Sequence, residues 1–143
     1  MPDSKNILDV GFGAAIDPKA THGLERVTRS EWLSLGGENS QRAKLTFGVD
    51  WNGKWPYANG YFDRIVSYHA VGVWESNAAC YAEMLRTLAG GGHAYIYVGK
   101  FQPALAEICG LMWQAGFEMC NTRELLESWR IDGKKKKVYG CIG

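Results

Sequence analysis

The chain has 143 residues, of which 46% are hydrophobic and 22% charged, a composition typical of a single globular domain with its own core. A formal net charge of +1 gives no electrostatic reason to expect a nucleic-acid or membrane partner. The chain opens without an apolar signal segment and has no apolar run of about 18 residues, so we expect a cytoplasmic protein without membrane spans.

The cysteines indicate neither disulfides nor a metal site. There are four, with no Cys-x-x-Cys pair and no nearby histidine at metal-ligand spacing: Cys80, Cys109, Cys120 and Cys141. We expect them to be reduced and to pack as small apolar residues, and we expect no bound metal.

The first motif lies near the start of the chain. Residues 6–10 are an apolar run broken by one acid, which predicts a buried strand. Gly11 and Gly13 follow and allow a tight turn where a ligand can approach the main chain. Asp9 lies just before this turn, at the carboxyl end of the strand, where open α/β sheets bind ligands. The pattern predicts a nucleotide-like cofactor site, although a strand followed by an ordinary turn has the same sequence.

The next segment combines strand and helix signals. Any helix before Gly23 must be short, because Pro18 is tolerated only in a first helical turn. Residues 24–32 predict a second strand, with β-branched residues at its centre. Glu31 lies 20 residues after the first glycine of the turn, the spacing at which nucleotide-binding folds place an acid on a ribose hydroxyl. Glu31 is equally suited to the start of a short helix at residues 32–35.

Two further strands are predicted in the middle of the chain. Residues 44–51 predict a third strand that ends in Asp50 and Trp51, and residues 62–67 predict a fourth. For Asp50 the alternative is a turn-forming acid before the Asn-Gly pair that follows, and Trp51 is equally suited to the core.

The second half of the chain alternates helix and strand patterns. Apolar residues at three- and four-residue spacing predict two helices. In order, the pattern predicts a helix between a cap at Ser76-Asn77 and the Gly90–Gly92 run, a strand at 93–98, a helix from Pro103 to Gly116, and a strand beginning at 117–120. Residues 129–142 predict a closing hairpin with its turn at Asp132-Gly133. We expect Lys134–Lys137 to form a solvated edge of this hairpin rather than a phosphate site.

Strands that alternate with helices predict a Rossmann-like, doubly wound α/β fold with a mainly parallel sheet. The closing hairpin adds an antiparallel edge. No repeat or long linker divides the chain, so we expect one domain over residues 1–143.

Three stretches resemble motifs of the class I S-adenosylmethionine-dependent methyltransferases. Residues 7–13, Ile-Leu-Asp-Val-Gly-Phe-Gly, resemble the first glycine motif. Residues 49–65 resemble the third-strand acid and the lead into the fourth strand, and residues 81–92 the helix and glycine turn before the fifth. The stretches follow the family's order over roughly residues 6–120. The resemblance implies S-adenosylmethionine as the cofactor and methyl transfer to a small-molecule acceptor.

The family pattern implies a cofactor site built from several segments. The methionine moiety would lie at the tip of the first strand, the ribose hydroxyls on Glu31 through two charge-assisted hydrogen bonds, and adenine on Asp50 and against Trp51. Ser67 and Tyr68 would line the methyl-transfer cavity. The implied cofactor-binding residues are Asp9, Gly11, Phe12, Gly13, Glu31, Asp50, Trp51, Ser67 and Tyr68.

The residues after the fourth strand bear on the acceptor. His69 is the best placed general base, because the unperturbed pKa of an imidazole lies near neutrality, and a packing histidine is the alternative. The stretch 67–70, Ser-Tyr-His-Ala, lacks the Asp/Asn-Pro-Pro motif of amino-methylating DNA enzymes, so DNA is not the expected acceptor.

The chain departs from the family at three points. Ala15 replaces the third glycine, Phe12 stands where a smaller residue is common, and no N-terminal helical segment covers the substrate pocket. A non-catalytic cofactor-binding or partner subunit is therefore the alternative function, and the uncovered surface would favour a homo-oligomer. A nicotinamide-dependent oxidoreductase is a third hypothesis, but Ile16 breaks its glycine fingerprint and no Tyr-x-x-x-Lys is present.

Overall fold

The computed structural model describes residues 5–13, 16–37, 43–68, 78–100 and 105–137. Three expectations lie outside this part of the chain: the general base His69, the helix cap at Ser76-Asn77, and the end of the closing hairpin at 138–142. Within the described part, no helix is both long enough and apolar enough to cross a membrane.

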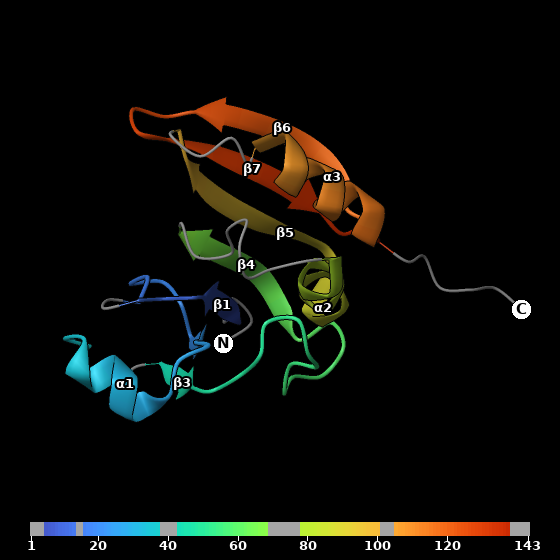
Figure 1. Cartoon of the computed structure of the whole chain (residues 1–143). Coiled ribbons are helices and arrows are strands. Elements are labelled where there is room, and N and C mark those ends of the chain that lie inside the picture. The colour runs from blue at the N-terminus through green and yellow to red at the C-terminus, as the bar shows by residue number, and fades with distance from the viewer. Residues whose placement is uncertain (1–4, 14–15, 38–42, 69–77, 101–104, 138–143) are drawn as a thin grey trace, which may run out of the picture.

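The described residues contain a seven-stranded sheet with the order β3-β2-β1-β4-β5-β7-β6 (Figure 1). Strands β1 to β5 are parallel, and β7 runs antiparallel to both β5 and β6. The strands are β1 (Ile7–Val10), β2 (His22–Leu24), β3 (Lys44–Thr46), β4 (Phe62–Tyr68), β5 (Leu88–Gly99), β6 (Glu118–Glu124) and β7 (Ser128–Lys134). This confirms the predicted α/β fold, mainly parallel with an antiparallel C-terminal edge.

Two helices, α2 (Ala78–Thr87) and α3 (Leu105–Ala115), pack against each other over one face of the sheet (Figure 1). The core lies between them and the strand residues that point to that face, among them Leu8, Ile65, Ile96 and Ile131, all fully buried. The strand residues that alternate with these, such as Arg64, point to the other face of the sheet. Both predicted helices are confirmed, because each repeats apolar residues at helical spacing. The first ends at Thr87, however, and the Gly90–Gly92 run that was expected to stop it lies inside β5.

The predicted second strand at 24–32 is wrong. Strand β2 ends at Leu24, and the short helix α1 (Arg29–Ser34) begins after Thr28. The Thr28 hydroxyl accepts a hydrogen bond from the Glu31 N–H, and the Glu31 carboxylate accepts one from the Thr28 N–H, each 3.2 Å long. This reciprocal capping box starts a helix where the β-branched residues favoured a strand.

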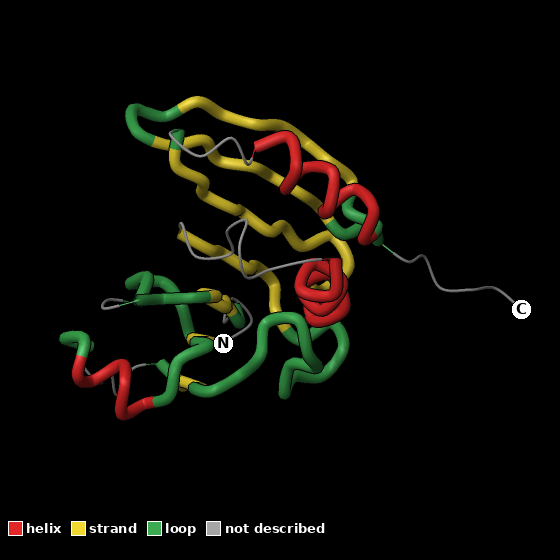
Figure 2. Tube along the Cα trace, in the orientation of Figure 1, coloured by secondary structure: helices red, strands yellow, loops and turns green. Residues whose placement is uncertain are grey.

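The third strand is shorter than predicted. Strand β3 ends at Thr46, and Gly48 has a φ of 68°, in the left-handed region that regular strands do not use. The connection from there to β4 is a series of loops and turns without a helix (Figure 2), as the Asn-Gly pairs in it indicate.

The expected hairpin turn at Asp132-Gly133 is also wrong. Both residues lie inside β7, and the hairpin joins β6 to β7 instead. A Cβ at Gly133 would lie 2.6 Å from Met112 Cε, so α3 packs directly on the backbone there. Asp132 pairs with His93 of β5, with 2.7 Å between Oδ1 and Nδ1. Tertiary packing outweighs the local turn preference of the Asp-Gly pair.

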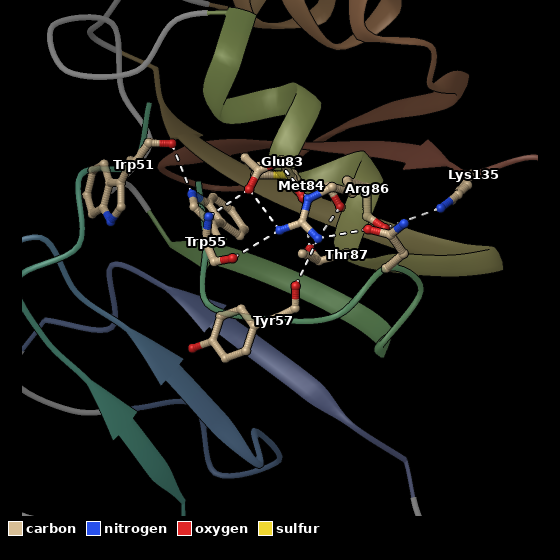
Figure 3. A network of polar contacts seen from close by, with 9 residues as sticks. Trp51, Trp55, Tyr57, Glu83, Met84, Arg86, Thr87 and Lys135 are labelled. Carbon is tan, nitrogen blue, oxygen red and sulfur yellow. Dashed lines mark hydrogen bonds and ion pairs between the residues drawn. The ribbon is translucent and has the colours of Figure 1, made fainter. Parts of the chain in front are cut away.

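Helix α2 ends in a network of polar contacts around Arg86 (Figure 3). The guanidinium donates hydrogen bonds to both Glu83 carboxylate oxygens, at 2.7 and 2.8 Å. It also donates to the backbone carbonyls of Trp55 and Tyr57, and to the side chain of Asn59. All five guanidinium donors are therefore used, and the hydrogen bond from Arg86 holds the pKa of Glu83 below its ordinary value.

Lys135 extends this network and is not a solvated edge residue. Its Nζ donates to the carbonyl oxygen of Leu88 at 2.7 Å. It also donates to that of Arg86 at 3.5 Å (Figure 3). Burial lowers the pKa of this lysine. Lys136 and Lys137 are exposed, as predicted. The lysine run thus has one member that binds carbonyl oxygens at the C-terminal end of α2.

We expect Lys135→Ala to lower the free energy of unfolding by about 1–2 kcal/mol, because it removes charge-assisted bonds to carbonyls that are partly buried. The matched change Lys136→Ala removes an exposed lysine and should have almost no effect. Urea denaturation of both variants measures the difference, and equal stabilities would contradict the assigned contact.

Candidate functional site

The turn after β1 has the conformation that the glycines predict. Gly11 and Gly13 have φ values of 69° and 60°, in the left-handed region. The Gly11 N–H donates to the carbonyl of Leu24 at 2.7 Å, which ties the tip of β1 to the end of β2. Gly11 is buried and Gly13 is exposed. Gly13 therefore offers the part of this main chain that a ligand can reach.

The side chain of Phe12 does not point to solvent. It packs edge-on against Trp32 and Phe47, with ring centroids 5.6 and 5.8 Å apart. Gly23 makes room for it, because a Cβ there would lie 2.6 Å from Phe12 Cδ1. Trp32 also donates through Nε1 to the carbonyl of Gly13 at 2.6 Å. The tip of β1 is thus partly covered by an aromatic cluster, and Phe12 contributes packing there.

Asp9 is the buried acid beside the turn, with 1% of its surface exposed. Its Oδ2 accepts a hydrogen bond from the Asp17 N–H at 2.9 Å, whereas Oδ1 has no partner among the described residues. Burial raises the pKa of Asp9 to about 7, and the nearby charges of Asp17 and Glu25 add to the rise. A desolvated carboxylate oxygen without a donor fits a ligand that brings a cationic N–H group.

The raised pKa makes stability depend on pH. The folded protein holds the Asp9 proton up to about pH 7, whereas the unfolded chain releases it near the ordinary aspartate pKa of 3.8. The contribution of Asp9 to the free energy of unfolding is therefore fully present below that value and is lost as the pH rises to about 7, because the folded state binds more protons in this range. In Asp9→Asn the loss of unfolding free energy that Asp9 causes between these pH values should vanish. Urea denaturation of both proteins at about pH 5 and about pH 8 measures the difference. Equal pH dependence in both proteins would contradict a raised pKa.

Glu25 occupies the place that was expected for Glu31. It follows the last residue of β2 and is 8% exposed. Its Oε2 accepts from the Gly13 N–H at 3.2 Å, and its Oε1 from the Arg26 N–H at 2.8 Å. The carboxylate of Glu31, by contrast, caps α1. The sequence signal for this arrangement is the Thr-x-x-Glu capping box, which ends the strand before Thr28.

A cavity of about 160 Å³ lies beside this turn and reaches both Gly13 and Glu25. Its wall comes from the loop after β1, the end of β2 and both ends of α1: Gly13, Glu25, Val27, Trp32, Leu35 and Gly37. The cavity is small beside the roughly 300–1,000 Å³ of typical ligand pockets. It has room for one ring of a larger ligand.

Asp50 lies in a turn and Trp51 in the core, which are the alternatives to a cofactor-binding role that the sequence left open. Asp50 is exposed, and its Oδ1 accepts from the Asn52 N–H at 3.0 Å in a turn. Trp51 is 3% exposed within the core, and its carbonyl accepts from Trp55 Nε1 at 3.0 Å (Figure 3). The guanidinium of Arg26 lies 5.8 Å from the Trp51 ring centroid. The structure thus brings neither residue against the glycine turn.

Ser67 and Tyr68 end β4 next to β1. The Ser67 hydroxyl donates to the carbonyl of Val10 at 3.0 Å and is fully buried. The Tyr68 hydroxyl donates to Asp17 Oδ2 at 2.5 Å, and its ring stacks on Tyr97 with centroids 4.6 Å apart. Burial and the hydrogen bond to Asp17 raise the pKa of Tyr68 above its ordinary value. Both residues therefore lie at the carboxyl end of the sheet, as predicted.

One cluster was not foreseen. Side chains of His93, Cys120 and Asp132 come from three strands, and their possible metal-ligand atoms lie within 4.8 Å of one another. The sequence shows no ligand spacing here, because only the sheet register brings these residues together. Cys80, Cys109 and Cys120 are free thiols, and the absence of a metal stays a prediction.

The acids around the glycine turn favour a cationic ligand. The side chains of Asp9, Asp17 and Glu25 lie near one another close to the turn. Asp9 keeps its proton up to about pH 7, and a cation beside it would favour its ionised form. No helix follows the turn in residues 11–13 and 16–21, so the described chain offers no helix N-terminus for a pyrophosphate there. The site is chemically suited to an ammonium or sulfonium group.

Comparisons with known proteins concern the fold. Neither a family model nor a curated protein sequence matches the chain. A TehB-like S-adenosylmethionine-dependent methyltransferase from Corynebacterium glutamicum superposes with a TM-score of 0.73 and 18% identity, over 95% of this chain and 83% of that one. An S-adenosylmethionine-dependent methyltransferase from Mesorhizobium loti superposes with a TM-score of 0.71 and 12% identity, over 92% of this chain and 91% of that one. The [4+2]-cyclase SpnF superposes with a TM-score of 0.74 and 13% identity, over 94% of this chain and 76% of that one. The chain therefore has the fold of the class I S-adenosylmethionine-dependent methyltransferases.

Proposed function

We propose that this protein is a methyltransferase that binds S-adenosylmethionine across the carboxyl ends of β1 and β2 and methylates a small-molecule acceptor. One observation carries the proposal: the buried Oδ1 of Asp9, which has no partner among the described residues, lies beside a glycine turn with two further acids nearby. S-adenosylmethionine presents an ammonium and a sulfonium, which these carboxylates attract, whereas the pyrophosphate of NAD would be repelled.

The residues present fit this cofactor in part. Asp9 would accept from the ammonium, and the exposed Gly13 would lie against the ligand. Glu25, in place of Glu31, would accept from the ribose hydroxyls, because each carboxylate oxygen keeps a lone pair beyond the hydrogen bond it already accepts. The cavity beside Glu25 has room for the ribose. Asp50 is exposed with its Oδ2 available for the adenine amino group, while Trp51 would support this loop from the core.

The cofactor supplies a methyl group already activated on a sulfonium. Transfer is an in-line displacement, so the main task of the protein is to hold the two reacting atoms in contact and aligned. Asp9 orients the donor, and Tyr68, fixed by Asp17 and Tyr97, forms the wall beside it. His69 stays the proposed general base. The fold also occurs in a [4+2]-cyclase, so catalysis of methyl transfer is tested separately from binding.

The pair Glu25→Gln and Glu31→Gln tests which acid binds the ribose. We expect the first change to weaken S-adenosylmethionine binding about tenfold, by the value of one charge-assisted hydrogen bond. Glutamine keeps the capping box at the second position, so Glu31→Gln should leave the affinity unchanged. Calorimetric titration measures both.

A greater loss in Glu31→Gln than in Glu25→Gln would refute the assignment of Glu25. Incubation with methyl-labelled S-adenosylmethionine and candidate acceptors then tests catalysis. Transfer of label supports the methyltransferase, and binding without transfer to any acceptor supports a non-catalytic cofactor-binding subunit.

A further inference from the structure

The face of the sheet opposite α2 and α3 contains a cavity of about 470 Å³. In the described residues no helix covers β4, β5 and β7 on this side (Figure 1). The lining residues come from these strands, from β1 and from the loop before β2: Ile7, Asp17, Pro18, Lys19, Arg64, Val66, Tyr68, Tyr95, Tyr97 and Arg130. The volume lies within the roughly 300–1,000 Å³ usual for small-molecule sites.

The charge of this cavity is unbalanced. Lys19, Arg64 and Arg130 line it, and none of their side chains has a hydrogen-bond or ion-pair partner among the described residues. The Nε of Arg130 is buried and lacks an acceptor. Asp17 is the single carboxylate in the lining, and it already accepts from the Tyr68 hydroxyl. A buried donor without an acceptor is unfavourable, so the cavity lacks a group that brings negative charge.

One aromatic ring, that of Tyr95, contacts both arginines. The guanidinium carbons of Arg64 and Arg130 lie 5.7 and 5.3 Å from the ring centroid of Tyr95. These contacts position a guanidinium through its face and leave its N–H edge free to bind a carboxylate or phosphate. The stacked rings of Tyr68 and Tyr97 form a neighbouring wall of the cavity. That wall is suited to a planar, apolar group.

We propose that this cavity binds a small organic anion: an aromatic ring that carries a carboxylate or a phosphate. Arg64, Arg130 and Lys19 bind the anionic group, and the stacked tyrosines contact the ring. The positive charge of the cavity also argues against a helix or a second copy of the chain as the group that covers this face. A helix or a second copy of the chain that docks through an apolar surface would have to bury the arginines without acceptors.

The cavity extends to the proposed cofactor site. Asp17 and Tyr68 line it, and the Asp17 N–H is hydrogen-bonded to Asp9. The next step rests on the methyltransferase function proposed above: the anion bound in this cavity is the methyl acceptor. Its nucleophilic atom forms a bond to the methyl carbon, and the sulfur–carbon bond breaks with its electron pair left on sulfur. The proton of the nucleophile goes to the general base, for which His69 is proposed above, and from there to water.

Titration of the whole protein with phenyl phosphate, benzoate and the neutral benzyl alcohol, at constant ionic strength, tests the site. Calorimetry and NMR shifts of backbone amides in β4 and β5 give the affinity and the place. We expect one or both anions to bind and the alcohol not to bind; the tighter anion identifies the group. Arg130→Gln and Arg64→Gln should each weaken binding about tenfold.

Lys44→Gln is the matched control, because it removes a positive charge from the same sheet outside the cavity. It should change the affinity by less than about twofold. Neither arginine side chain has a hydrogen bond to another described residue, so thermal denaturation should show folded variants. Equal loss in Arg130→Gln and Lys44→Gln, or a dimer that shields β4 and β5 and binds no anion, would overturn the proposal. Anion binding without S-adenosylmethionine binding would refute only the proposed function. S-adenosylmethionine binding without anion binding would refute only the anion site.

Discussion

Replacing Arg86 by lysine is expected to lower the free energy of unfolding by about 2–3 kcal/mol, although the positive charge is kept. The guanidinium places five donors on five acceptors in the loop before β4 and at the end of α2. An ammonium has three donors and lacks the planar fork, so at least two acceptors lose their partner. The carbonyls of Trp55 and Tyr57 are partly buried, which makes the loss unfavourable.

Arg123→Lys is the matched control for this change. Arg123 is exposed on β6 and should tolerate lysine with a change below about 0.5 kcal/mol. Urea denaturation gives both values. A loss for Arg86→Lys as small as that for Arg123→Lys would show that the network does not hold α2 to the preceding loop.

Gly11→Val is expected to abolish detectable S-adenosylmethionine binding. The φ of 69° at this position is unfavourable for a β-branched residue, and the residue is buried at the tip of β1. The turn must shift to accept the side chain, which moves Gly13 and the bond from its N–H to Glu25. The proposed binding surface is then lost together with the conformation of the turn.

Gly60→Val separates strain from ligand binding. Gly60 has a nearly identical φ of 66° but lies in the loop before β4, away from the proposed site. Both variants should lose stability, and Gly60→Val should keep the wild-type affinity for S-adenosylmethionine in a calorimetric titration. An affinity for Gly11→Val close to that of Gly60→Val would show that the turn after β1 does not contact the cofactor.

The parts of the fold with strong periodicity were predictable from the sequence. Strand β1 is a short run of mainly apolar residues, β4 has β-branched residues at its centre, and α2 and α3 repeat apolar residues at helical spacing. The errors arose where a local signal competed with another interaction. Val27 and Thr28 favoured a strand, yet the capping box formed a helix. The turn preference of Asp132-Gly133 was outweighed by close packing of α3.

The candidate site was predictable only where it lies on those regular elements. Asp9, Gly11 and Gly13 follow directly from β1, and Ser67 and Tyr68 from β4. Spacing from Gly11 and a strand at 24–32 point to Glu31 as the acid after the second strand, but β2 has just three residues and ends at Leu24, directly before Glu25. The cavity of arginines and tyrosines depends on the register of three strands, which no local pattern specifies.

Calorimetric titration of the whole protein with S-adenosylmethionine, and in parallel with NAD, is the most direct test. The carboxylates of Asp9, Asp17 and Glu25 predict that S-adenosylmethionine binds at one site and that NAD, with its pyrophosphate, does not. Tighter binding of NAD, or no heat of binding with S-adenosylmethionine, would contradict the proposed cofactor site.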